Sequence, residues 1–244
     1  MSPASEVCLN SKDSIGMNQA IVQSFGGITL VGGAPFSAPL FRMAHQRAPL
    51  IVAADGGADR ILALGFCPDA VIGDMDSITD AARVAIGADR LHKIAEQDTT
   101  DFDKALRSID SAFVIALGFM GARVDHGLAV FNALVQSHTA CVLLGAKDVV
   151  FHAPPRLEID LRKGDRFSLF PMAPVCGESR GLEWPIDGLD FAPDRRVGTS
   201  NRVVEGRVGL DLSGPGMLCI LPRARLDQVL TALTGATRAE SRSR

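Results

Sequence analysis

The sequence predicts a two-part α/β protein, in which a mostly parallel sheet covered by helices is followed by an antiparallel β-sandwich. Short apolar runs alternate with helical patterns from Gly27 to about residue 150, as in three-layer α/β folds. After Lys147 the pattern changes to short alternating runs separated by Gly, Pro and Asp turns. Several early strands also end in glycine or aspartate, at the edge where open α/β sheets bind ligands.

These changes of pattern divide the 244 residues into four expected parts. They are a disordered N-terminal extension at 1–26, an α/β catalytic domain at 27–150, a β-sandwich domain at 151–224, and a C-terminal segment at 225–244 that ends in a disordered tail. Because ordered patterning begins only near Gly27, we hypothesise that the natural chain starts at Met17. An intact mass that includes residues 1–16 would exclude this start.

Composition favours small-molecule chemistry in a soluble protein. The hydrophobic fraction is 47% and the charged fraction 22%, and a net charge of -3 gives no electrostatic reason to expect nucleic acid or an anionic membrane as partner. No apolar run approaches the length of a membrane span, and the N-terminus lacks the pattern of a signal peptide. Five cysteines form no CxxC pair. We therefore expect a cytoplasmic protein with reduced, buried thiols and no zinc site.

The spacing of apolar residues and the positions of helix-capping residues predict the strands and helices of the α/β part. Ser37 is a suitable N-cap with Pro39 in the first turn behind it, and Gly65 and Pro68 stop the second helix. The expected strands are 27–33, 50–55, 70–73, 90–94, 112–117 and 141–146. The expected helices are 37–46, 58–65, 79–86, 101–109 and 127–136. The sandwich strands are expected at 149–152, 156–161, 165–170, 202–205, 207–212 and 216–221.

The segment VIGDMDS delivers Asp74 and Asp76 at the end of a buried strand. Carboxylates two residues apart in a turning segment can reach one hard cation, and Asp101 can add a third oxygen from a neighbouring helix start. Mg²⁺ is the expected ion, because it prefers a few carboxylates completed by water and phosphate oxygens. The alternative is that Asp74 and Asp76 are ordinary turn residues, which the second acidic cluster disfavours.

Glycines at two strand ends give a weaker signal for phosphate binding. Gly33 ends the first strand, and Gly56 and Gly57 follow Asp55 after the second. Glycines at such positions let backbone N–H groups approach phosphate, although glycines after strands more often only form tight turns. The chain has neither GxGxxG nor GxxxxGK[ST], which argues against a standard Rossmann dinucleotide site or a Walker P-loop.

The segment QDTTDFD adds more acids at a helix start. Thr100 is a good N-cap, Asp103 completes a T-x-x-D capping box, and Lys104 follows Asp101 on nearly the same side of the helix. Complementing the helix dipole explains one or two of these acids, but not Asp98, Asp101 and Asp103 together beside a second acidic strand end.

Two later segments contribute further polar groups. The turn after 112–117 carries Arg123 and Asp125, and the arginine suits either a transferring phosphoryl group or an ion pair with Asp125. His126 fits a capping or packing role better than catalysis. Trp184 is the only tryptophan, and beside the loop GTSN at 198–201 it can stack on a flat heterocycle, although a lone tryptophan more often packs in a core.

Taken together, five motifs resemble the thiamine pyrophosphokinase family over roughly residues 28–222. They are ADGGADR, PDAVIGDMDSI, QDTTDFDKAL, GARVDH, and GLEWPI with TSN, in the order that the family has them. The resemblance implies an α/β catalytic domain joined to a β-sandwich, and a homodimer with thiamine sites between subunits. It implies transfer of the β,γ-pyrophosphoryl group of Mg-ATP to the hydroxyethyl oxygen of thiamine, which gives thiamine diphosphate and AMP.

The resemblance also implies roles for individual residues. Metal binding is expected at Asp74, Asp76 and Asp101, and catalysis at Asp101, Arg123 and Asp125. Nucleotide binding is expected at Gly33, Asp55, Gly56, Gly57, Gln97, Asp98, Thr100 and Lys104, and thiamine binding at Trp184, Ser200 and Asn201. Asp101 or Asp125 is the base for the alcohol. Gly198 departs from the family, since some members have serine there, and the N-terminal extension is a second departure.

Two alternatives stay open from the sequence. A pyrophosphokinase acting on another alcohol, such as a hydroxymethylpterin, would keep the acidic cluster but would not need Trp184 and the TSN loop. A noncatalytic thiamine or nucleotide sensor would keep the pocket but could lose the metal ligands, which are all present here.

Overall fold

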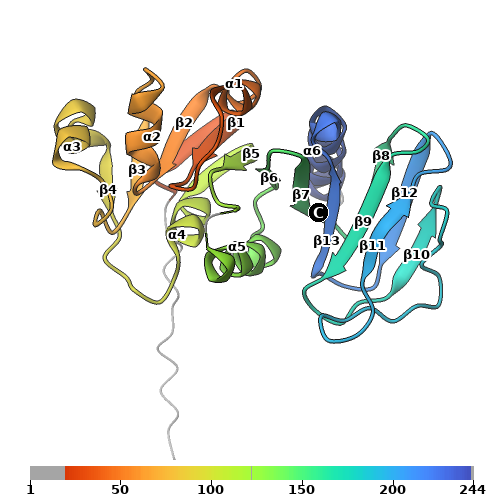
Figure 1. The fold of residues 1–244 in the computed structure, drawn as a ribbon. Helices are drawn as coiled ribbons and strands as arrows, with labels where there is room; N and C mark the ends of the chain where they lie inside the picture. The colour runs from red at the N-terminus through yellow and green to blue at the C-terminus, as the bar shows by residue number, and fades with distance from the viewer. Residues whose placement is uncertain (1–19, 122, 243–244) are drawn as a thin grey trace, which may run out of the picture.

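The computed structural model describes residues 20–121 and 123–242, apart from the side chains of 236–242. The proposed start at Met17 and most of the N-terminal extension lie outside these residues. The described chain forms a ten-stranded sheet, with helices on both faces of its parallel part, and a separate three-stranded sheet (Figure 1). This is the predicted combination of a mostly parallel α/β sheet and an antiparallel β portion.

The α/β part closely follows the predicted elements. Its strands are β1 (Val22–Val31), β2 (Leu50–Ala54), β3 (Ala70–Gly73), β4 (Leu91–Lys93), β5 (Ile109–Leu117) and β6 (Cys141–Leu144). Its α-helices are α1 (Ala38–His45), α2 (Gly57–Ala63), α3 (Asp80–Ile86), α4 (Asp101–Arg107) and α5 (Val124–Gln136). The Ser37 side chain accepts the Leu40 N–H, and that of Thr100 accepts the Asp103 N–H, so both predicted N-caps are confirmed.

The antiparallel part differs more from expectation. Its strands are β7 (Asp148–His152), β8 (Arg156–Asp160), β9 (Arg166–Pro171), β10 (Gly177–Arg180), β11 (Gly198–Arg202), β12 (Arg207–Leu212) and β13 (Met217–Pro222). The sequence pattern missed β10 and placed β11 at 202–205, because GESR and GTSNR have little alternation of apolar side chains.

The ten-stranded sheet has the order β11-β9-β13-β7-β6-β5-β1-β2-β3-β4. Strands β6 to β4 are parallel, and the antiparallel segment begins where β7 pairs with β6. The connection between β6 and β7 is the short turn 145–147, so the chain folds back without leaving the sheet. The predicted domain boundary at residue 150 falls inside β7, which is hydrogen-bonded to β6 and to β13. The division into domains stays a prediction.

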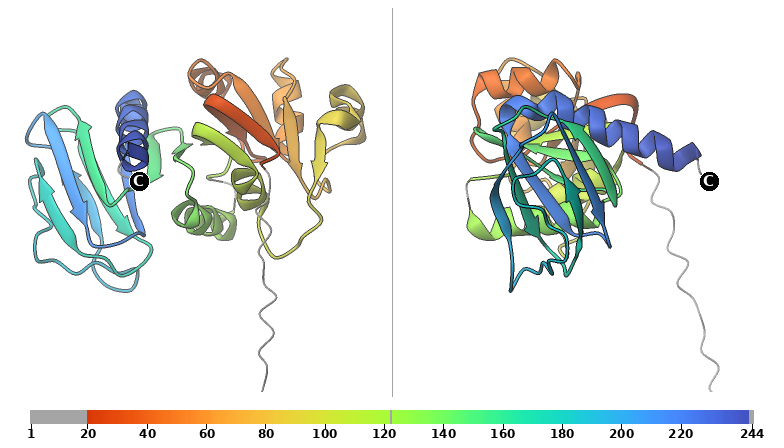
Figure 2. Two further views of the ribbon diagram at one scale, coloured as in Figure 1. Left: turned by 180° about the vertical axis from the view of Figure 1, so that it is seen from behind. Right: turned by 90° about the vertical axis from the view of Figure 1, so that its right-hand side faces the viewer.

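Both ends of the described chain are more regular than expected. Strand β1 begins at Val22, which pairs with Ile109, so part of the segment predicted to be disordered belongs to the sheet. Helix α6 (Leu226–Arg242) continues to residue 242, where we expected a disordered tail (Figure 2). Leu226, Val229 and Leu233 recur at helical spacing and are buried in the core, which explains how the helix begins.

The helices of the α/β part lie in two layers (Figure 1). Side chains of α1 and α2 pack in one core cluster, while those of α4 and α5 pack in another on the opposite side of the sheet. Helix α6 packs against β8 of the three-stranded sheet. No helix within residues 20–121 and 123–242 is both long and apolar enough to cross a membrane.

The cysteines in the described part of the chain form no disulfide. Cys141 and Cys219 are buried, and this burial raises the pKa of both thiols. Cys67 and Cys176 are exposed, which corrects the expectation that the thiols would be buried.

Gly57 is fixed by a close approach between α2 and β1. A Cβ at this position would lie 2.1 Å from the Val31 carbonyl oxygen, which is backbone and cannot give way. We expect Gly57→Ala to lower the free energy of unfolding by about 2 kcal/mol or more, measured by urea denaturation. Gly235→Ala in α6 is the control, because no atom lies within 4 Å of its Cβ. Equal stabilities of the two variants would contradict this packing constraint.

Candidate functional site

A cleft of about 560 Å³ opens at the carboxyl ends of β1, β2, β3 and β5. This is the edge where parallel sheets present loops and helix starts to a ligand. The predicted site residues that line the cleft are Gly33, Gly56, Asp74, Gln97, Thr100, Asp101, Lys104 and Arg123. Arg60, Ser77 and His126 line it as well, although the sequence reasoning had not selected them.

Three carboxylates meet beside this cleft. Asp55, Asp74 and Asp101 each offer an oxygen, and these oxygens all lie within 4.8 Å of one another. They come from the ends of β2 and β3 and from the first residue of α4, which the parallel order of the sheet brings together. Gly73 leaves the necessary space, because a Cβ there would lie 2.9 Å from the Asp55 Cβ and 3.4 Å from Asp101 Oδ1.

Asp55 is the buried member of the group. Its side chain is 1% exposed; Oδ2 accepts the Ser77 N–H at 3.1 Å, whereas Oδ1 has no hydrogen-bond partner. A buried carboxylate oxygen without a partner is costly unless something binds it, and hard cations take such oxygens as ligands. The donor set of this group therefore fits Mg²⁺, with Asp55, Asp74 and Asp101 as the residues that would hold it.

Asp76, which the sequence assigned to the metal with Asp74, is not among the three acids whose oxygens all lie within 4.8 Å of one another, but its side chain interacts with those of Asp55 and Asp74. Its role as a metal ligand stays a prediction. Between the two acids, Met75 has a φ of 68° and a buried side chain, and this left-handed residue turns the chain. Asp74 Oδ1 accepts the Asp76 N–H, while Asp76 Oδ1 accepts the Ser77 hydroxyl at 2.7 Å. Asp76 is exposed at the rim, and the Ser77 hydrogen bond lowers the pKa of its carboxyl.

The electrostatics of the group follow from burial and repulsion. Burial raises the pKa of Asp55 to about 6, against the lowering effect of the Ser77 N–H, and neighbouring Asp76, Asp101 and Asp74 add to the rise. Burial also raises the pKa of Asp101, against the opposing effect of Lys104. A group of carboxylates that resists ionisation in this way gains most from a bound cation.

Lys104 is the counter-ion of the group. Its side chain is only 2% exposed, and Nζ lies 3.5 Å from Asp101 Oδ1 and 3.7 Å from Asp74 Oδ2. An ammonium group this deeply buried is stable only when paired, so Lys104 and the two acids depend on one another. The sequence placed Lys104 on the same side of the helix as Asp101, but its burial was not evident from the pattern.

Arg123 and Asp125 form an ion pair at the rim. Arg123 Nε lies 3.1 Å from Asp125 Oδ1, and both side chains are about two-thirds exposed. This hydrogen bond raises the pKa of Arg123 and lowers that of Asp125. Arg123 lines the cleft and Asp125 does not. The geometry therefore fits both predicted roles of Arg123, because the side chain pairs with Asp125 and also faces the cleft.

Besides the buried Asp55, two predicted nucleotide ligands lie outside the cleft lining. Gly57 is buried against β1, where it serves packing, and Asp98 is exposed beside the cleft-lining residues Gln97 and Thr99. Gly57 thus allows a close approach between two backbone segments, whereas its neighbour Gly56 faces the cleft.

The predicted thiamine residues form a second locus, in which Ser200 and Asn201 lie on β11 and Trp184 lies in the segment between β10 and β11. The Trp184 N–H donates to Asn201 Oδ1, and Asn201 Nδ2 donates to the Trp184 carbonyl at 2.7 Å. Ser200 has a φ of 64° and donates its N–H to Ser168 Oγ. Trp184 is 57% exposed and therefore available for stacking, which excludes the alternative of a core tryptophan. A Cβ at Gly198 would lie 3.1 Å from Leu169 Cβ, so a larger residue would be crowded there.

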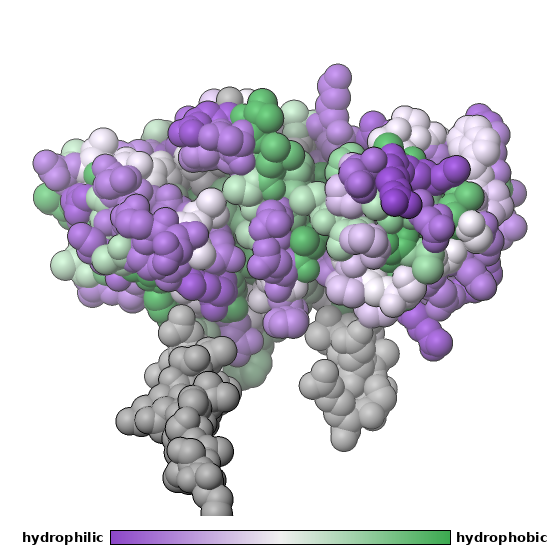
Figure 3. All heavy atoms as spheres, turned by 90° about the horizontal axis from the view of Figure 1, so that it is seen from below, coloured by the Kyte–Doolittle hydropathy of each residue, from purple (hydrophilic) through white to green (hydrophobic). Residues whose placement is uncertain are grey.

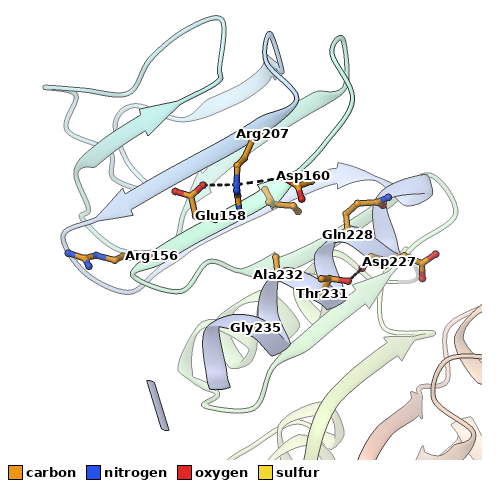
Figure 4. Close-up of a pocket in the computed structure, with 10 residues that line it drawn as sticks. Arg156, Glu158, Asp160, Arg207, Asp227, Gln228, Thr231, Ala232 and Gly235 are labelled. Carbon is orange, nitrogen blue, oxygen red and sulfur yellow. Dashed lines mark hydrogen bonds and ion pairs between the residues drawn. The ribbon is translucent and has the colours of Figure 1, made fainter. Parts of the chain in front are cut away.

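A second hollow of about 560 Å³ lies between α6 and β8 (Figure 4). Its charged side chains pair with one another: Arg207 lies 3.2 Å from Glu158 and 3.6 Å from Asp160. Charges that neutralise one another in this way leave little to attract a polar ligand. We therefore place the candidate site in the cleft beside Asp55, where a buried oxygen lacks a partner.

Fold and site together define an α/β protein with an acidic cleft at the carboxyl edge of its parallel sheet. Residues 41–144 match the family model described as the catalytic domain of thiamin pyrophosphokinase. The chain is similar to thiamine pyrophosphokinase 1 of Oryza sativa, with 28% identity over 209 residues that cover 71% of this chain and 78% of the relative. Thiamin pyrophosphokinase 1 of Caenorhabditis elegans is 24% identical over 189 residues, covering 69% and 77%.

Solved structures show the same fold. The thiamin pyrophosphokinase of Candida albicans has a TM-score of 0.68 at 16% identity, covering 86% of this chain and 95% of the other. That of Bacillus subtilis has a TM-score of 0.63 at 24% identity, covering 80% and 98%. The chain is thus similar in sequence to thiamine pyrophosphokinases and shares the fold of their solved structures.

The burial of Asp55 makes a prediction about stability. A raised carboxyl pKa means that the ionised form opposes folding, so the cost is present above pH 6 and disappears as the pH falls toward 4. We expect Asp55→Asn to raise the free energy of unfolding of the metal-free protein at pH 7.5, and the difference from wild type to vanish near pH 4. Asparagine tolerates the φ of 40° at this position.

The same variant tests the cation. Mg²⁺ should raise the melting temperature of the wild type and leave that of Asp55→Asn almost unchanged, because ligand binding stabilises only a competent site. Asp110→Asn, at an exposed position of β5, is the control that should respond to Mg²⁺ as the wild type does. A wild-type protein no less stable than Asp55→Asn at pH 7.5 would contradict the burial argument.

Proposed function

We propose that this protein is a thiamine pyrophosphokinase, which transfers the β,γ-pyrophosphoryl group of Mg-ATP to the hydroxyethyl oxygen of thiamine. The observation that carries the proposal is the group of Asp55, Asp74 and Asp101 around an unpartnered buried oxygen, in a cleft beside Lys104 and Arg123. The family match and the similar curated proteins support the same reaction. They give no support to a hydroxymethylpterin kinase or to a noncatalytic sensor.

The reaction balances in a single displacement. The thiamine oxygen bonds to the β-phosphorus, the bond from that phosphorus to the oxygen of the α-phosphate breaks, and AMP leaves with the bonding electrons. When bound, Mg²⁺ would supply charge neutralisation on the phosphate oxygens. Arg123 faces the same cleft, so its guanidinium can bind an oxygen whose charge grows in the transition state.

The alcohol proton needs an acceptor, and the two candidate carboxylates differ in basicity. The pKa of Asp101 is raised by burial, while Arg123 lowers the pKa of Asp125. A carboxylate with a higher pKa is the stronger base, and Asp101 also lines the cleft whereas Asp125 does not. We therefore assign the base role to Asp101 in preference to Asp125.

We further propose that a complete site needs two copies of the chain. Strands β3 and β11 stand eight positions apart in the ten-stranded order, which at about 4.8 Å per strand is on the order of 38 Å. That is several times the length of thiamine, so one copy cannot bring its own Trp184 to its own Asp101. A homodimer in which β11 of one copy faces the cleft of the other would unite the two loci.

Exposed apolar surface supports such a partner. Val124 is 82% and Leu128 59% exposed, one turn apart at the start of α5 beside the cleft. Seen from below, one face of the molecule has apolar surface between the α/β part and the antiparallel part (Figure 3). Exposed apolar side chains next to a site are typical of surfaces that another subunit covers.

The metal assignment predicts a large loss of turnover. Asp74→Asn should reduce the rate of AMP release from Mg-ATP and thiamine at least about a hundredfold, because it removes charge that holds the cation. The product should be thiamine diphosphate, identified by mass. Asp80→Asn is the control, since this acid of α3 is fully exposed and lies away from the cleft. Near-normal turnover in Asp74→Asn would refute the assignment, and AMP release without thiamine would refute the acceptor.

The shared site predicts complementation between two inactive variants. Asp101→Asn and Trp184→Ala should each be nearly inactive, but unfolding them together and refolding the mixture should restore about a quarter of the wild-type rate. Half of the dimers are then mixed, and each mixed dimer has one of its two sites intact. A refolded mixture no more active than the sum of its separately refolded components would mean that each site lies within one chain.

A further inference from the structure

The basic side chains that line the cleft differ in whether a carboxylate already pairs with them. Lys104 lies between Asp74 and Asp101, and Arg123 is paired with Asp125. Arg60 also lines the cleft, and within the described residues its side chain has no carboxylate partner. The acid next to it in sequence, Asp59, is engaged by the N–H and hydroxyl of Thr79. Of these three cleft cations, Arg60 is therefore the one whose charge no carboxylate of the described residues neutralises.

Arg60 is also held in position. It lies in α2, and its Nε donates to the carbonyl oxygen of Gly33 in the loop after β1, which lines the same cleft. This bond uses one N–H of the guanidinium and leaves the four N–H groups of the two terminal nitrogens without a partner among the described residues. A half-buried guanidinium anchored at Nε is preorganised, so little side-chain entropy is lost when a ligand binds.

We propose that Arg60 binds a phosphate oxygen of the nucleotide, as a specificity-determining contact on the wall opposite α4 and α5. This inference rests on the proposed function, since it needs a nucleotide triphosphate in the cleft. Paired N–H donors of an arginine match phosphate geometry, and thiamine, which is cationic, would be repelled from the same place. Arg60 would thereby help to assign the two substrates to different ends of the site.

The test is direct binding of a nucleotide that cannot react. In α,β-methylene-ATP the bond that the proposed reaction breaks is blocked, so its affinity in the presence of Mg²⁺ can be measured by calorimetry without thiamine. We expect Arg60→Gln to weaken this binding about 10- to 100-fold, and Arg60→Lys to weaken it less, because a charge remains without the planar donors. In turnover, Arg60→Gln should raise the KM for ATP and leave the KM for thiamine within about twofold.

Arg90→Gln is the matched control. Arg90 is also half-buried and donates to a backbone carbonyl, that of Pro68, but it does not line the cleft. Its variant should bind the analogue as the wild type does. Arg60→Gln that binds the analogue within about twofold of wild type would overturn the inference and leave the proposed function intact. A wild-type protein that does not bind the analogue at all would overturn both, and a KM for thiamine that rises as much as that for ATP would indicate a structural role for Arg60.

Discussion

The concentration of negative charge at the ends of β2 and β3 is the constraint on which the site depends. Asp55, Asp74 and Asp101 lie within 4.8 Å of one another, and like charges at this distance oppose folding unless a cation is near. The chain supplies part of the compensation itself, by burying Lys104 against two of the acids. The parallel sheet then holds the acids in place, and the missing side chain of Gly73 lets them approach.

The location of the site was predictable because the residue pattern indicates where the buried strands end. An apolar run followed by Asp74, and a capped helix that begins at Asp101, predicted two acids at one sheet edge, and the structure brings them together. The third acid was not predictable from spacing. Spacing marks Asp76 as the partner of Asp74, but the parallel pairing of β2 with β3 also brings Asp55 to within 4.8 Å of Asp74. The positive φ of Met75 has no local signal in the sequence, because a non-glycine residue rarely adopts it.

The fold shows the same division between local and nonlocal information. Helix caps and buried parallel strands were predicted well, because Ser37, Thr100 and the apolar runs act locally. Strands β10 and β11 were missed or misplaced because their residues are polar and partly exposed, and tertiary pairing decides their conformation. The joining of the two parts through β7 was also not predictable, since a change of pattern marks a change in strand direction as readily as a boundary between domains.

The continuous sheet has a consequence for how such a protein can change over time. The acidic end and the β11 end belong to one sheet but are separated by the strands between β3 and β11. Substitutions at distant, independent positions usually have additive effects. Changes near Trp184 would therefore leave the folding of the acidic group in the same copy undisturbed. In the proposed homodimer, where Trp184 of one copy faces the cleft of the other, the acceptor pocket could diverge without refolding the acidic end of its own chain.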